Sequence, residues 1–155
     1  LMTTVLSASM LSLVTKRPVK IVLTKEEQLM SYEVRLGSTI TAKIGMDKEG
    51  YVRAVEGDWL VDTGAVADSV QGQVGVGLGE AQLVCAKCPN WYMDSHIAVT
   101  NKQPAGIVRG YGGQELNSCL ERLMCTVMKE GNFNPLDVFK KNYIAPGDRF
   151  IWRDG

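Results

Sequence analysis

The sequence predicts a single domain of the α+β class, in which a long β-hairpin and further strands pack with helices. Three observations predict this class. Alternating apolar residues on both sides of the turn Asp47–Gly50 indicate a hairpin. Apolar residues at steps of three and four near both ends of the chain indicate helices. The 155 residues contain no internal repeat and no low-complexity linker, so we interpret residues 1–155 as one subdomain.

Charge and hydropathy limit the classes of partner. The chain has 17 Lys and Arg residues against 17 Asp and Glu residues, so its formal net charge is zero. A neutral chain gives no electrostatic reason to expect nucleic acid or an anionic membrane surface as a partner. With 45% apolar residues the chain can form a buried core, yet no apolar run reaches the length of a transmembrane helix.

The N-terminal region predicts a helix, a strand and a second helix. Apolar residues recur at helical steps over Met2–Val14, and Pro18 stops this helix because the residue before a proline avoids helical angles. Val19–Leu23 is continuous and β-branched, which predicts a buried strand. Thr24 and Glu27 have the spacing of a capping box, which predicts the start of a short helix. A helix at the first residues and an abrupt end indicate a segment cut from a longer protein.

The middle of the chain gives the clearest β signal. Ile40, Ala42 and Ile44 alternate with polar residues before the turn, and the pattern resumes from Tyr51 to Asp62. Gly50 supplies the positive φ that closes such a turn.

Residues 64–84 are rich in glycine, which predicts a bent segment or a close approach of two backbones. The clustered glycines are Gly72, Gly75, Gly77 and Gly79. No Lys-Ser or Lys-Thr pair follows them, so the pattern does not indicate a P-loop. A further strand is expected over Trp91–Thr100, after a turn at the sequence CPN.

The C-terminal region predicts two helices. An apolar stripe indicates the first, from about Glu115 to Lys129, with Gly131 as its stop. The stripe consists of Leu116, Leu120, Leu123, Met124, Val127 and Met128. Asn134 then caps a last short helix with proline in its first turn. Its apolar residues are Leu136, Val138 and Phe139.

Cysteine and histidine allow three interpretations. The favoured one is that Cys85, Cys88, Cys119 and Cys125 are small buried thiols of a cytosolic protein. The two-residue gap between Cys85 and Cys88 also fits a redox dithiol or half of a zinc site, although a zinc site needs two more ligands. His96, the one histidine, lies in a strand-like stretch, where a local partner is expected.

The stretch PAGIVRGYGGQE, Pro104–Glu115, carries the strongest functional signal. Its glycines remove side chains from a loop that enters a helix N-terminus, where backbone amides favour an anion or a polarised oxygen. Arg109 adds a planar fork of donors, and Tyr111 adds a ring between glycines. The alternative is a tight strand-to-helix turn in which Arg109 only caps carbonyl groups.

This stretch resembles a known motif. TNKQPAGIVRGYGGQE is similar to the TN…P…RG(F/Y)G segment of the molybdenum hydroxylases, the xanthine dehydrogenase and aldehyde oxidase family. Three more segments resemble family motifs in the same order, namely RPVKIVLTKEEQL, LVDTGAVADS and NPLDVFKKNYIAPGD. The order and rough spacing agree over essentially the whole chain. The chain therefore resembles the first molybdopterin-binding subdomain of that family's large subunit.

The resemblance implies a role for each residue of the loop. Arg109 and Gly110 are expected to contact the molybdopterin cofactor, and Tyr111 is expected to pack on the substrate. No catalytic residue and no metal ligand is expected within residues 1–155, because the general-base glutamate and the GGFGGK loop of the family are absent here. The fragment alone is therefore expected to be inactive.

The resemblance also implies partners. These are the remainder of the molybdenum subunit, iron–sulfur and FAD domains or subunits, and a small-molecule substrate, in the cytoplasm. Two positions depart from the family pattern. Gln114 stands where the family usually has proline, and Leu78–Ala81 lacks the arginine of purine-oxidising members, which leaves aldehydes and heteroaromatic compounds open as substrates. A stand-alone anion- or nucleotide-binding module and a thiol or zinc protein remain as alternatives.

Overall fold

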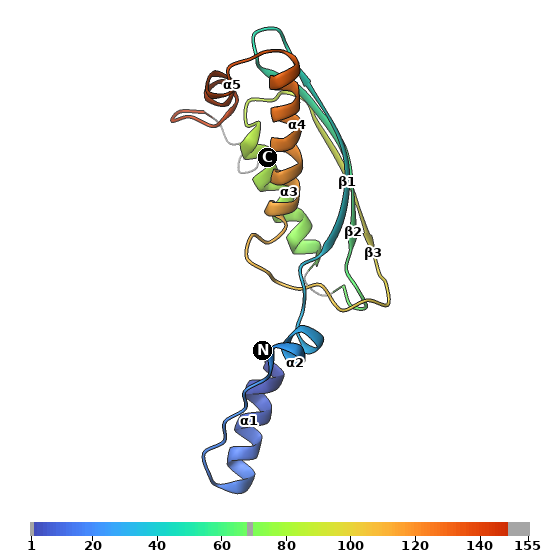
Figure 1. The fold of residues 1–155 in the computed structure, drawn as a ribbon, viewed down its shortest axis with the longest axis vertical. Coiled ribbons are helices and arrows are strands. Elements are labelled where there is room, and N and C mark those ends of the chain that lie inside the picture. Colours follow the sequence, from blue (N-terminus) through green and yellow to red (C-terminus); the bar gives the residue numbers. More distant parts are fainter. Residues whose placement is uncertain (1, 68–69, 149–155) are drawn as a thin grey trace.

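A computed structural model describes residues 2–67 and 70–148, and these form a sheet-and-helix body with an N-terminal arm (Figure 1). The last two residues of the predicted motif LVDTGAVADS lie outside the described ranges. The elements are α1 Met2–Thr15, α2 Lys25–Ser31, β1 Gly37–Met46, β2 Val52–Asp62, α3 Val70–Val84, β3 Trp91–Ala98, α4 Gly113–Glu130 and α5 Pro135–Asn142. The predicted α+β class is confirmed.

The predicted hairpin is confirmed as β1 and β2, which pair antiparallel. Gly50 closes the turn with φ +86°. The Asp47 carboxylate accepts hydrogen bonds from the amides of Glu49 (3.0 Å) and Tyr51 (2.9 Å), which fixes the turn. The register of the two strands is therefore set locally.

The third strand joins the sheet through a crossover. β3 pairs with β2 in parallel, from Val55 opposite Trp91 to Asp62 opposite Ala98, so the sheet order is β1-β2-β3. A parallel pair needs a long connection, and α3 supplies it. The expected strand at Trp91–Thr100 is thus confirmed, two residues shorter, and its parallel partner gives the sheet a mixed character.

The expectation of a bent glycine-rich segment over residues 64–84 is wrong in part, because residues 70–84 form the regular helix α3. The expected close backbone approach is present. A Cβ at Gly77 would lie 2.7 Å from the carbonyl oxygen of Gly112 and 3.1 Å from the Trp59 ring. Packing of α3 on the sheet and on α4 therefore outweighs the poor helix propensity of its glycines.

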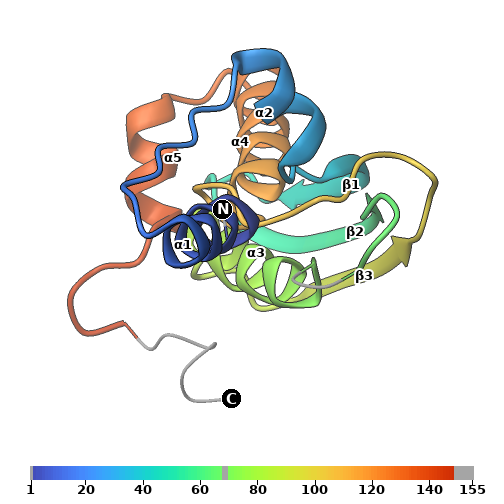
Figure 2. The same cartoon turned by 90° about the horizontal axis from the view of Figure 1, so that it is seen from below.

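The core lies between the sheet and the helices α3 and α4, which cover one of its faces (Figure 2). The α4 stripe is confirmed, and its fully buried members are Leu116, Leu120, Met124 and Met128. Gly131 is the C-cap of α4, as expected. Trp59 of β2 is buried beneath these helices and donates through Nε1 to Ser38 Oγ at 3.0 Å.

The last helix, α5, packs at the end of the body that carries the hairpin turn (Figure 1). Asn134 caps it, as predicted, by accepting from the Leu136 amide at 2.9 Å. Its Val138 is buried and its Phe139 packs against the core, whereas Leu136 is exposed, contrary to expectation. The buried Asn142 side chain links α5 to the hairpin by accepting from the Val52 amide at 2.8 Å.

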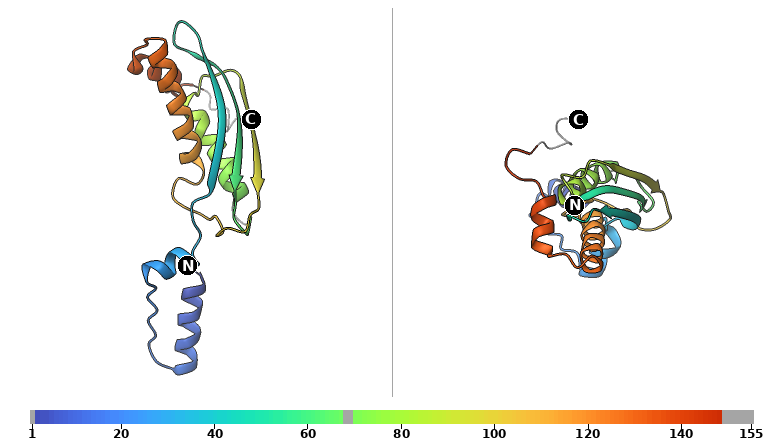
Figure 3. Two further views of the ribbon diagram at one scale, coloured as in Figure 1. Left: turned by 45° about the vertical axis from the view of Figure 1, so that its right-hand side comes forward. Right: turned by 90° about the horizontal axis from the view of Figure 1, so that it is seen from above.

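The arm consists of α1, α2 and the segment that joins them, and it projects away from the body (Figure 3). The α2 capping box is confirmed in both directions between Thr24 and Glu27. The predicted buried strand Val19–Leu23 is wrong: these residues are in no strand, and Val22 is 73% exposed. Their β-branched composition favours a strand, but a strand needs a partner, and none pairs with them among the described residues. Within the described ranges no helix has the length and apolar character needed to cross a membrane.

Candidate functional site

Three loops converge at the carboxyl ends of the parallel strands β2 and β3, where α4 also begins (Figure 1). The Thr63 amide donates to Ala98 at 3.0 Å, and the Ala105 amide donates to Thr63 at 2.9 Å. The Gly106 amide donates to Val34 at 3.0 Å, which adds the chain leaving the arm. In open sheets this end of parallel strands is where ligands commonly bind.

Asp62 fastens two of these loops together. Its carboxylate accepts from the Thr100 hydroxyl and from Lys102 Nζ, both at 2.6 Å, and from the Gly64 amide at 3.0 Å. These hydrogen bonds, that from Lys102 first, lower the pKa of Asp62 from 3.8 to about 2. Two of the segments that resemble family motifs, one with Asp62 and one with Thr100, are therefore joined in space.

The Arg109 turn has an unusual backbone. Gly110, Tyr111 and Gly112 all have positive φ, at 103°, 38° and 92°. The Tyr111 amide donates to Val108 at 3.0 Å and the Gly113 amide donates to Gly110 at 2.7 Å. Tyr111 is a non-glycine residue in a sparsely populated region, so the surroundings must hold the turn in place.

The glycines of this turn pack against α3. A Cβ at Gly112 would overlap the carbonyl oxygen of Gln73, and one at Gly113 would overlap the Glu80 carboxylate. The Tyr111 hydroxyl lies beside Gly72, 2.7 Å from the position of a Cβ there. The glycines therefore allow two backbones to meet, in addition to shaping the turn.

The start of α4 differs from the predicted bare-amide cradle. The Gly113 amide already has a partner within the turn, and the carboxylates of Glu80 and Glu115 lie at the same helix end. Acidic groups stabilise a helix N-terminus, so the protein itself supplies the negative charge there. Negative charge of the protein beside this helix end disfavours a free anion there.

Arg35, between α2 and β1, holds the turn from the other side. Its Nη1 lies 2.9 Å from Glu115 Oε1, and its Nη2 donates to the Arg109 carbonyl oxygen at 2.5 Å. The Glu115 side chain is only 8% exposed, and its Oε2 has no hydrogen-bond partner among the described residues. Sequence reasoning missed Arg35, because nothing near it in the chain indicates a partner 74 or 80 residues away.

The structure brings the three predicted site residues into this one turn. The Arg109 residue is exposed, while Gly110 and Tyr111 are half-buried. The turn thus presents one exposed guanidinium group from a backbone held by both Arg35 and α3. The Arg109 fork fits an acceptor-rich, negatively charged cofactor, whereas Glu115 Oε2 is buried and is not open to a ligand.

The cysteines give no support for a zinc site. Cys85 and Cys88 are buried, and burial raises the pKa of Cys85 to about 12 and raises that of Cys88. Among the described residues, no group of three or more potential metal ligands that meets at one point includes either thiol. The expectation of four buried thiols is confirmed for these two, whereas Cys119 is half-buried and Cys125 is exposed.

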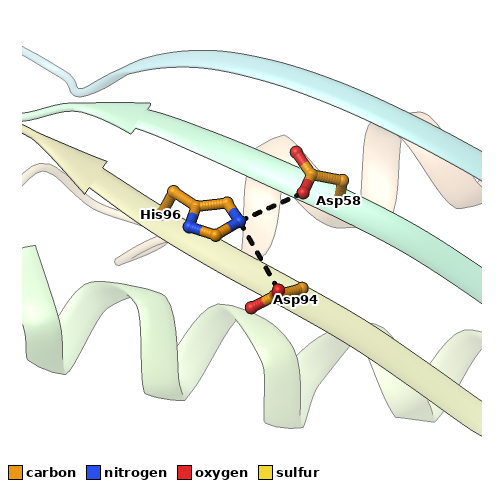
Figure 4. A group of neighbouring side chains, drawn as sticks. All are labelled: Asp58, Asp94 and His96. Carbon is orange, nitrogen blue, oxygen red and sulfur yellow. Dashed lines mark ion pairs between the residues drawn. The ribbon is translucent and has the colours of Figure 1, made fainter.

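His96 has local partners, as expected, on the open face of the sheet (Figure 4). Its Nε2 lies 3.3 Å from Asp58 Oδ2 and 3.5 Å from Asp94 Oδ2. Within the described ranges these three form the only group of potential metal ligands that meets at one point. All three side chains are more than half exposed, and the imidazole already lies between the two carboxylates that face each other across the strands. Exposed ion pairs of this kind are common without a bound ion.

Comparison with known proteins indicates the same family as the sequence motifs do. Residues 1–143 match the family model described as molybdopterin cofactor-binding domain. A probable xanthine dehydrogenase subunit of Bacillus subtilis is 31% identical over 91% of this chain and 19% of its own length. The nicotinate dehydrogenase large molybdopterin subunit of Eubacterium barkeri is 30% identical over 80% of this chain and 29% of its own length.

Solved structures agree with the fold. The aldehyde oxidoreductase from Desulfovibrio gigas superposes with a TM-score of 0.72 at 26% identity, over 90% of this chain and 15% of that one. Quinoline 2-oxidoreductase from Pseudomonas putida 86, at 23% identity, gives a TM-score of 0.77 over 90% of this chain and 18% of that one. The chain therefore spans less than a third of the length of these relatives.

Proposed function

This chain belongs to the molybdopterin cofactor-binding domain family, and from that premise we propose that it forms part of a molybdenum-dependent hydroxylase. The substrate class is an aldehyde or a heteroaromatic compound, and water is the oxygen source. The observation that supports this best is the family match over residues 1–143 together with a braced, cationic turn at the carboxyl ends of β2 and β3. The family match favours this role over a stand-alone anion- or nucleotide-binding module.

Arg109 and Gly110 hold the cofactor in this proposal, and Tyr111 lines the substrate side. The exposed Arg109 guanidinium is suited to an acceptor-rich group, because its planar fork makes charge-assisted hydrogen bonds. Gly110 lets the cofactor approach the backbone, since it has no side chain and a φ of 103°. When bound, the molybdenum cofactor supplies the redox centre for oxidation of the C–H bond.

The proposal places the other functional parts outside residues 1–155. We expect the remainder of the molybdenum subunit to provide the general base and most cofactor contacts, and iron–sulfur and flavin domains or subunits to carry electrons. The fragment alone is then inactive. Four free thiols support a reducing, cytoplasmic location.

Substitution of Arg109 by Ala in the full-length protein tests the cofactor role. Loss of a charge-assisted hydrogen bond should weaken cofactor retention by about ten- to a hundredfold, and molybdenum content of the purified protein should fall with activity. Arg122→Ala, on the exposed surface of α4, is the matched control and should retain both. Unchanged molybdenum content and activity in Arg109→Ala would show that the cofactor role is wrong.

A further inference from the structure

We propose that Arg35 is the positioning residue that sets the shape of the Arg109 turn. This inference deepens the proposed function and rests on it for its consequence, since the turn is the part proposed to hold the cofactor. The geometry on which it depends is a single guanidinium group that contacts both ends of the turn, at Arg109 and at Glu115.

The two contacts of Arg35 are made by different nitrogens of one plane. Nη1 reaches Glu115 Oε1 at 2.9 Å, and Nη2 reaches the Arg109 carbonyl oxygen at 2.5 Å. Residue 109 is the first residue of the turn, and residue 115 lies in the first turn of α4. Because the fork is rigid, it fixes the distance between these two points, which a single point charge cannot do.

Burial makes the contact between Arg35 and Glu115 hard to replace by water. The Glu115 side chain is 8% exposed and the Arg35 side chain 34% exposed. A carboxylate this buried needs a partner for its charge, and Arg35 is the cation paired with it. The positive end of α4 adds to its stabilisation. Removing the guanidinium therefore leaves a buried carboxylate without its cation, which is relieved by protonation or by movement of the turn.

Arg35 is itself held in place by its neighbours. The Val34 amide donates to Pro104 at 3.1 Å, and the Gly106 amide donates to Val34 at 3.0 Å. Leu36 on the other side is buried in the core. A side chain that orients another residue works best when its own backbone is fixed, and these contacts fix it.

The turn needs such a brace because its backbone is strained. Tyr111 has φ 38° between two glycines that also have positive φ. The α3 helix supports one side of the turn through Gly72 and Gln73. Arg35 supports the other side, so that the Arg109 side chain projects from a fixed carbonyl group.

Arg35→Lys tests this directly in the full-length protein, because it keeps the charge and removes the fork. The Tyr111 and Gly113 amides are hydrogen-bonded within the turn, so their hydrogen exchange reports its opening. We expect their exchange to rise by about ten- to a hundredfold, the factor for one hydrogen bond with a charged partner. The amides of Leu120 and Met124 in α4 should be unchanged. Arg53→Lys, which alters another arginine–carboxylate pair on the hairpin, should leave the turn unchanged.

Two exchange results would overturn the proposal. Equal exchange at Tyr111 and Gly113 in Arg35→Lys and in the unsubstituted protein would show that the fork does not brace the turn. An equal rise across the turn and α4 would show that Arg35 acts on global stability only.

Molybdenum content separates this inference from the proposed function. We expect Arg35→Lys to retain less than Arg53→Lys and more than Arg109→Ala. If Arg109→Ala retains full content, the proposed cofactor role fails while the exchange result on Arg35 still stands. If Arg109→Ala loses content and Arg35→Lys retains it in full, the brace has no consequence for the cofactor and the positioning role is overturned.

Discussion

Helices α1 and α4 both contain many apolar residues but distribute them differently. In α4 these residues form one stripe that faces the sheet, and Leu120 of that stripe is 0% exposed. In α1 they lie on most sides of the helix, the arm places no comparable surface against them (Figure 1), and Leu13 is 77% exposed. A narrow apolar stripe therefore predicts which side of a helix is buried, whereas apolar content alone does not.

The joint between arm and body is polar, in contrast to the apolar interior of the body. Gln103 Nε2, on the body, donates to the carbonyl oxygens of Leu29 and Tyr32 in the arm. Such a joint fixes direction but buries little apolar surface, so it contributes less stability than the core does.

The largest difference is expected from one truncation in each helix. Leu120→Ala should lower the free energy of unfolding by about 2–5 kcal/mol, because it opens a cavity in the core. Leu13→Ala should change it by no more than about 0.5 kcal/mol, because the side chain is exposed. Urea unfolding of both variants measures this. Similar losses in the two would mean that α1 is covered in solution.

The glycines of α3 test how the body tolerates close packing. Gly77→Ala should lower the free energy of unfolding by about 1–3 kcal/mol, because its Cβ would lie 2.7 Å from the Gly112 carbonyl oxygen. Gly75→Ala is the matched control, with nothing within 4 Å of the new Cβ, and should raise stability by up to about 1 kcal/mol. Thermal melts of the two variants measure these changes in stability. A Gly77→Ala variant more stable than the unsubstituted protein would contradict the observed contact.

The exposed arm should make the chain associate with itself. Contiguous apolar surface promotes association, so the weight-average mass in sedimentation should rise with concentration. Replacing Leu13 and Val14 by Ser should lower that association by about thirtyfold if each exposed side chain contributes about 1 kcal/mol. A strict monomer at all concentrations before substitution would indicate that the arm folds back onto the body.

The smallest expected effect is a loss of stability at acidic pH. Asp62 has a folded-state pKa of about 2, below its ordinary 3.8, so its contribution to stability is present above the ordinary value and is lost as pH falls through about 2. The stability of the unsubstituted protein should therefore fall more steeply from pH 4 to 2 than that of Asp62→Asn. Glu130→Gln, at the exposed end of α4, controls for the loss of one charge. Parallel pH profiles for all three proteins would exclude this role for Asp62.

Local signals predicted most of the fold. The capping box at Thr24, the turn at Gly50 and the cap at Asn134 are confirmed because each depends on residues a few positions apart. The α3 helix was missed because its glycines disfavour a helix locally and are explained only by contact with Gly112 and Trp59. The strand predicted at Val19–Leu23 failed for the converse reason, since β propensity cannot supply a partner strand.

The site was located from the sequence, but its supports were not. Arg109, Gly110 and Tyr111 form one turn, as the short spacing requires. Arg35 and Glu80 reach that turn from distant parts of the chain, and no local pattern marks them. Whether the three residues of the turn contact cofactor and substrate stays a prediction.

The left-handed turn also divides its positions into fixed and variable ones for protein engineering. Gly112 accepts no side chain, because the Gln73 carbonyl oxygen lies where a Cβ would be, and Gly110 keeps a φ that other residues rarely adopt. Arg109 and Gln114 are exposed and flank this pair. A randomised library at positions 109 and 114 would therefore vary the exposed side chains of the turn while preserving its backbone. A library that included the glycines would consist mostly of misfolded members.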